Sequence, residues 1–132
     1  MARTVYMNTV ILCAAAAFAA SPALAADVSA EITNAALHAG YAAQGNDIGT
    51  VHTHLHHTVN CLVGPGGAGF DAKELNPCAN TGNGAIPDST NAATKGKLQS
   101  ALATANSGLA ATDLATAKKD AADAEAALKT AS

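Results

Sequence analysis

The chain has 132 residues and a formal net charge of −3 at pH 7; 49% of its residues are hydrophobic but only 3% are aromatic. This weak acidity excludes the basic surface that binds nucleic acid or anionic lipid, so we expect neither partner. With so few aromatic side chains, the core must consist of alanine, leucine, isoleucine and valine. Small domains with such thin cores usually need a cross-link or a partner, and we expect a disulfide-stapled monomer or weak dimer.

Residues 1–25 have the three parts of a bacterial secretory signal peptide. A basic start precedes an apolar run over residues 10–20, and an A-x-A sequence ends at Ala25. The apolar run is shorter than the roughly 20 residues that a membrane-spanning helix needs. We therefore expect cleavage after Ala25, a mature domain of residues 26–132 that is periplasmic or secreted, and no membrane attachment after cleavage.

A first pair of helices is predicted over residues 28–44 and 47–62. Apolar residues recur at helical spacing in both segments, Gly45-Asn46 interrupts the pattern, and Asp47 is a suitable N-cap for the second helix. Helices joined by so short a turn are antiparallel neighbours. The apolar stripe of the second helix consists of Ile48, Val51, Leu55, Val59 and Leu62.

A long loop is predicted over residues 63–88, which contain six glycines and three prolines. Only Cys61 and Cys78 remain after signal cleavage, and in an oxidising compartment a disulfide between them is the expected state. It would close a loop of about 18 residues and stabilise the fold by ~3 kcal/mol. We therefore expect Cys61 to be a disulfide partner and not a thiolate ligand. The loop itself is either functional or a stapled connection.

A second pair of helices is predicted over residues 89–106 and 112–130, both with alanine and leucine at helical spacing. Ser107-Gly108 is expected to end the first of these helices, and Thr112 or Asp113 to cap the second. The predicted fold is therefore all-α: a four-helix bundle of two helical hairpins, joined by the long Gly/Pro-rich and disulfide-anchored loop.

Four of the five histidines fall within six residues of the second predicted helix: His52, His54, His56 and His57. Imidazole is the commonest protein ligand for transition metals. On a helical wheel His52 and His56 flank the apolar stripe, and their i, i+4 spacing lets two imidazoles converge on one ion. His54 and His57 fall on the other side, so all four cannot bind one metal.

His38, on the first predicted helix, is the candidate third ligand. In an antiparallel hairpin it lies level with the histidine cluster, one turn or less from His52 and His56. We therefore predict a metal site of His38, His52 and His56 at the edge of the hairpin. Glu31 lies about two turns away and is a weaker candidate.

His54 and His57, spaced i, i+3, are candidates for a second and more exposed metal site. Two alternatives remain open for the cluster as a whole: a pH-responsive surface, because imidazole titrates near neutral pH, or a polar surface without a role. Both methionines lie in the predicted signal peptide and Cys61 is expected to be oxidised, so soft ligands are missing. Neutral imidazoles favour Cu(II), Ni(II) or Zn(II), with Cu(II) bound most tightly.

Haem is not expected, because the chain has no C-x-x-C-H motif and few bulky side chains for a haem pocket. Catalysis is not expected either. A metal hydrolase needs a general base near the ion, and the spacing of Asp71 and Glu74 in the loop does not place them near the histidines. No G-x-S-x-G motif occurs.

Residues 36–40 (Ala-Leu-His-Ala-Gly) and the hairpin over residues 47–57 resemble the small periplasmic His-rich metal-binding proteins of bacteria. These are alanine-rich four-helix bundles that bind several divalent metals. The resemblance covers roughly residues 28–62 and the alanine spacing of the last helix. It implies storage, buffering or delivery of a divalent metal. That family spreads histidines along all its helices, whereas this chain confines them to the first pair, so we expect one or two sites.

The main alternative function is a non-catalytic interaction module of the envelope or the extracellular space. In that hypothesis the bundle presents the loop of residues 63–88 to an unknown protein partner. Loss of metal binding on substitution of the histidines would favour the first hypothesis, and loss of partner binding on deletion of the loop tip would favour the second.

Overall fold

A computed structural model of the protein describes residues 25–132, so the predicted signal peptide lies, apart from Ala25, outside the described residues. The described residues form five helices and no strand, which confirms the all-α class. No helix among them is long and apolar enough to cross a bilayer. The helices are α1 (Val28–Gln44), α2 (Ile48–Val63), α3 (Ala85–Asp88), α4 (Ala92–Ala110) and α5 (Leu114–Lys129).

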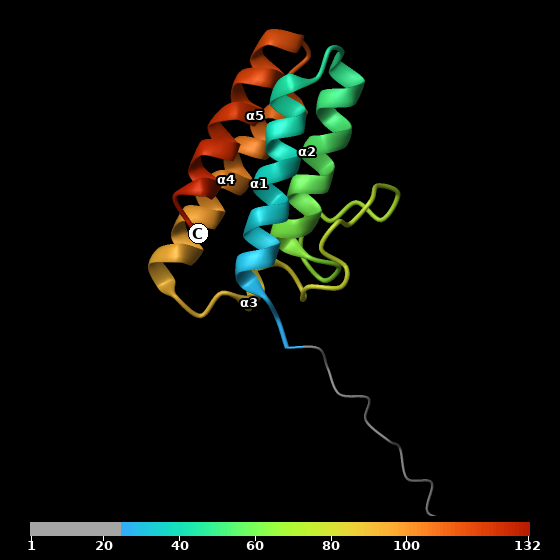
Figure 1. Ribbon diagram of the computed structural model, residues 1–132. Helices are drawn as coiled ribbons and strands as arrows, with labels where there is room; N and C mark the ends of the chain where they lie inside the picture. Colours follow the sequence, from blue (N-terminus) through green and yellow to red (C-terminus); the bar gives the residue numbers. More distant parts are fainter. Residues whose placement is uncertain (1–24) are drawn as a thin grey trace, which may run out of the picture.

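The four long helices lie side by side, a packing that is compatible with a bundle (Figure 1). Helix α1 packs against α2 and α5, α4 packs along α5, and α2 also contacts α4 and α5. The turns that join α1 to α2 and α4 to α5 lie at one end of the molecule, and α3 lies at the other. The histidine-bearing α2 therefore has α1 on one flank and α4 on the other.

Aspartate and asparagine side chains begin the long helices. Asp47 accepts a hydrogen bond from the amide of Thr50, as the sequence predicted, and Asp113 does the same for Thr116. Asn91 caps α4 in the same way, so this helix begins at Ala92 and not at residue 89.

The predicted end of the third long helix at residue 106 was wrong. Helix α4 continues through Ser107 and Gly108 to Ala110. Gly108 is buried, and a Cβ atom there would lie 2.8 Å from Cδ1 of Leu55 on α2. This glycine therefore lets α4 approach α2 closely, and tertiary packing outweighs the ~1 kcal/mol that glycine costs inside a helix. Likewise, the short helix α3 lies inside the segment predicted to be loop.

The core is as thin as the composition suggested. Its largest apolar side chains are Leu55, Leu62, Leu98 and Leu128, each fully buried, and most of the remainder is alanine. The predicted cross-link is confirmed, because Cys61 and Cys78 form a disulfide with their Cα atoms 5.1 Å apart. It ties the last turn of α2 to the segment that leads into α3.

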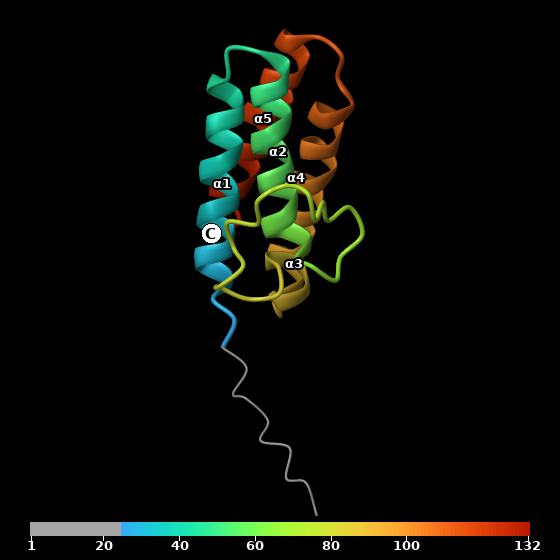
Figure 2. The same ribbon diagram turned by 90° about the vertical axis from the view of Figure 1, so that its right-hand side faces the viewer.

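The loop folds back along the lower half of α2 (Figure 2). Asn60 on α2 is fully buried and holds the loop in this position. Its Nδ2 donates to the carbonyl oxygens of Asp71 at 2.9 Å and Leu75 at 3.1 Å. Its Oδ1 accepts from the amide of Asp71 at 2.8 Å. The buried polar groups of both partners are thereby satisfied.

Candidate metal centre

Three imidazoles from two helices face one another: His38 of α1, and His54 and His57 of α2. The Nδ1 atom of His38 lies 3.3 Å from Nδ1 of His54 and 3.3 Å from Nδ1 of His57. One ring nitrogen from each histidine lies within 4.8 Å of the other two. Within residues 25–132 this is the one group of three or more histidine, cysteine or carboxylate side chains arranged so closely.

The separations fit the ligand shell of a small divalent ion. Zinc–nitrogen bonds of about 2.0–2.1 Å in a tetrahedral arrangement place the ligand nitrogens about 3.3–3.4 Å apart. His38 has this separation from both of its neighbours. The ligand nitrogens of His54 and His57 lie within 4.8 Å of each other. Three histidine ligands would leave the fourth position of a tetrahedral ion open.

The hairpin builds this cluster from simple helical spacing. His54 and His57 are three residues apart, so their side chains share one face of α2. Thr58, on the same flank, donates its hydroxyl to the carbonyl oxygen of Ala35 on α1 at 3.3 Å. This contact shows that α1 packs on the flank of α2 that carries His54 and His57, at the level of His38.

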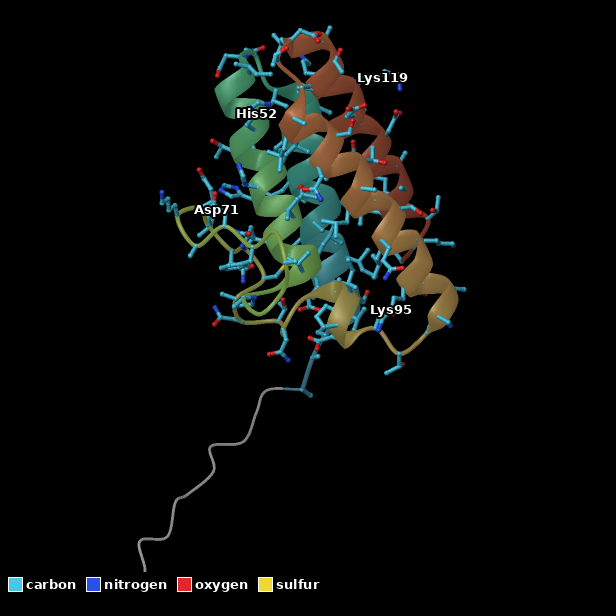
Figure 3. The ribbon with its side chains drawn as sticks, turned by 180° about the vertical axis from the view of Figure 1, so that it is seen from behind. His52, Asp71, Lys95 and Lys119 are labelled. Carbon is cyan, nitrogen blue, oxygen red and sulfur yellow. A yellow bond between two sulfur atoms is a disulfide. The ribbon has the colours of Figure 1, made fainter. Side chains whose placement is uncertain are left out.

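The predicted grouping of His38 with His52 and His56 differs from the observed one. The helical wheel correctly separated the two histidine pairs, but it assigned the wrong pair to the α1 side. His52 instead points to the junction after α4, where its Nε2 lies 3.2 Å from the carbonyl oxygen of Ala111. His56 lies beside the loop, with Nδ1 3.7 Å from Oδ2 of Asp71. Figure 3 shows His52 on the upper part of α2 and Asp71 on the loop, lower down beside the helix.

Glu31, the weaker ligand candidate, is not part of the cluster. It is fully buried, and its Oε1 accepts a hydrogen bond from the amide of Gly84 at 2.8 Å. Burial raises the pKa of this carboxyl, while the hydrogen bond from Gly84 opposes the rise. Glu31 therefore holds the start of α3 against α1, and its role in the fold is structural.

Burial keeps the imidazoles of His38 and His57 neutral, which is the form that binds metals. The pKa of His38 is lowered to about 4, first by burial and then by the neighbouring imidazoles of His57 and His54. The pKa of His57, which is only 8% exposed, is lowered by burial and by His54, although Glu74 opposes this shift. Both rings are therefore neutral at pH 7, so a metal would not have to displace protons from them.

Two further side chains border the imidazoles. Tyr41 is half-exposed, and its ring centroid lies 5.6 Å from that of His38 and 5.4 Å from that of His54. On the other side, Oε2 of Glu74 lies 3.6 Å from Nε2 of His57. Tyr41 thus covers part of the solvent side of the cluster, while Glu74 contacts it from the loop.

The proximity of Asp71 and Glu74 to α2 was missed in the sequence. A usable signal did exist: a disulfide from Cys61 to Cys78 must bring the intervening loop back along α2.

A pocket of about 630 Å³ between this loop and α4 is separate from the site, and no histidine lines it.

Comparison of the chain with protein-family models, with curated proteins and with solved structures finds no match in any of the three.

Proposed function

We propose that this protein binds one divalent transition metal ion through His38, His54 and His57. The observation that carries the proposal is the convergence of three imidazoles with Nδ1 separations of 3.3 Å from His38 to each neighbour. Nitrogen donors of this kind suit Zn(II), Cu(II) and Ni(II). Zn(II) matches the tetrahedral separations best, and Cu(II) has the highest affinity for imidazole by the Irving–Williams order.

The proposed role is storage, buffering or delivery, in a protein with a four-helix-bundle scaffold and no catalytic function. Structural zinc sites are closed by four protein ligands, whereas this cluster supplies three. His38 and His54 are also partly exposed, so a bound ion remains within reach of an acceptor ligand. An ion held in this way can be exchanged without unfolding the scaffold.

We also propose that the protein is exported to the periplasm or the medium after cleavage of its signal peptide. The support is the tripartite sequence of residues 1–25 and the Cys61–Cys78 disulfide, a bond typical of oxidising compartments. The resemblance of residues 36–40 and 47–57 to periplasmic His-rich proteins agrees with this location. Cell fractionation and the mass of the purified protein test it: a cytoplasmic protein that retains residues 1–25 would contradict it.

Two double substitutions on α2 test the metal site. Each protein is titrated with Zn(II), Cu(II) or Ni(II) against a chromogenic chelator that competes for the ion. The pair His54→Ala/His57→Ala removes two proposed ligands, whereas His52→Ala/His56→Ala removes two histidines of the same helix that lie outside the cluster. We expect the first variant to lose the high-affinity site and the second to retain it.

Metal-dependent stabilisation is an independent measurement. An ion that binds only the folded state should stabilise the protein by about 2.7 kcal/mol at a free concentration 100 times its dissociation constant. Affinity weaker than millimolar in the unsubstituted protein would refute the proposal, as would equal loss in the two double variants. If the protein instead binds a protein partner through the 63–88 loop, neither double substitution should weaken binding of that partner.

A further inference from the structure

We propose that Glu74 is the positioning residue of this metal centre, acting through His57, and that Asn60 holds Glu74 in place. The inference rests on the proposed function, since it concerns how the same three histidines are prepared for an ion. It assigns a role to the loop of residues 63–88, which otherwise only connects α2 to α3.

The two nitrogens of the His57 ring have different neighbours. Nε2 lies 3.6 Å from the Glu74 carboxylate, just beyond hydrogen-bond distance, and Nδ1 lies 3.3 Å from Nδ1 of His38. A carboxylate next to Nε2 stabilises the tautomer with its proton on that nitrogen. The lone pair is then left on Nδ1, the atom that lies next to Nδ1 of His38.

This choice of tautomer matters because Nδ1 of His38 contacts Nδ1 of both His54 and His57. In a close pair of nitrogens, one must carry a proton and the other a lone pair, and His38 contacts both neighbours. By stabilising the Nε2 proton, Glu74 makes His57 the partner with the lone pair. It also raises the basicity of His57 toward a metal, the effect that outer carboxylates have on histidine ligands.

The backbone around Glu74 is fixed from α2. Asn60 lies one turn after His57, and its side chain is bonded to the loop on both sides of Glu74, at Asp71 and at Leu75. The Cys61–Cys78 disulfide closes the same segment one residue further along α2. Two adjacent residues of α2 thus hold the loop against the helix face that carries the histidines.

The loop also supplies a matched control. Asp71 lies beside His56 at 3.7 Å, as Glu74 lies beside His57 at 3.6 Å, and both carboxylates are about one-third exposed. Asn60 anchors both, but only His57 belongs to the metal cluster. Each alanine substitution removes one negative charge from the loop beside α2, but only Glu74→Ala removes the carboxylate next to a proposed ligand.

The experiment compares Glu74→Ala and Glu74→Gln with Asp71→Ala in the full protein, with its disulfide intact, by competitive titration with Zn(II). Loss of an outer carboxylate typically weakens metal binding by 10–100-fold, and we expect this for Glu74→Ala. We expect less than about 3-fold for Asp71→Ala. Glu74→Gln should fall between them, because the amide oxygen can still accept a hydrogen bond from Nε2 of His57 while the charge is lost.

A spectroscopic measurement separates positioning from a change in folding. In the metal-free protein, long-range ¹H–¹⁵N correlation spectra should show the His57 proton on Nε2. In Glu74→Ala the Nδ1–H form should become populated, whereas Asp71→Ala should leave His57 unchanged. Equal affinities of the two alanine variants, or an unchanged His57 spectrum in Glu74→Ala, would overturn the inference. If the proposed function itself is wrong, the unsubstituted protein will bind no Zn(II).

Discussion

Acidification should destabilise the metal-free protein through the histidine cluster. The pKa of His38 is lowered from its ordinary value of 6.5 to about 4, mainly by burial. Between these pH values the unfolded chain binds more protons than the folded one, so the free energy of unfolding falls as the pH falls. The loss begins near pH 6.5 and is complete below about 4. His57 contributes in the same direction, because its pKa is lowered as well.

The size of the effect follows from the shift. One pKa unit corresponds to about 1.4 kcal/mol, which gives an upper bound of about 3 kcal/mol for His38. The ring is partly exposed, and screening by water reduces this to roughly 1–2 kcal/mol. For a domain of this size, each kcal/mol changes Tm by about 4–8 °C.

The assay is thermal unfolding with a chelator present, at pH 7 and at pH 4.5, of the unsubstituted protein, His38→Gln and His52→Gln. His38→Gln should lose about 1–2 kcal/mol less on acidification than the other two proteins. The N-cap aspartates Asp47 and Asp113 do not interfere, because hydrogen bonds lower their pKa below 3.8. An equal acid loss in His38→Gln and the unsubstituted protein would refute the reasoning.

Two further predictions concern stability and are read from guanidinium unfolding curves. Replacement of both Cys61 and Cys78 by serine should lower the free energy of unfolding by about 3 kcal/mol; an unchanged value would show that the loop is already ordered in the unfolded chain. Gly96→Ala should raise stability by up to about 1 kcal/mol, since nothing lies within 4 Å of the added Cβ. Gly108→Ala on the same helix should lower it, because the Cβ would lie 2.8 Å from Leu55. Equal effects at the two glycines would contradict this account of α4.

Predictions from local signals agree with the structure at several particular positions. Asp47 and Asp113 begin their helices because a side-chain oxygen three residues before a free amide satisfies it, whatever surrounds the helix. The disulfide was predicted from the expected signal peptide and from the two cysteines that follow it. Gly108 shows the limit of this logic: glycine is a helix terminator in the sequence, but its place between α4 and Leu55 depends on packing.

In the candidate site, too, local signals predicted part of the arrangement and tertiary packing determined the rest. All three cluster residues were among the five candidate histidines, and the helical wheel separated His54 and His57 from His52 and His56. The wheel gives angles around one helix, however, and not the flank on which the next helix packs. For the same reason Glu74 was not connected with His57, because their contact depends on the path of the loop held by Asn60.

By itself, the sequence determined that this chain forms helices, where most of them begin, and that its chemistry is concentrated in histidines on one hairpin. These properties depend on the 3.6-residue period, on capping and on composition, all of which act over a few residues. Only the tertiary structure decided which histidines lie close together, and which carboxylate contacts one of them. Those contacts depend on how α1 and the disulfide-anchored loop pack around α2, and many residues distant in the sequence determine that packing together.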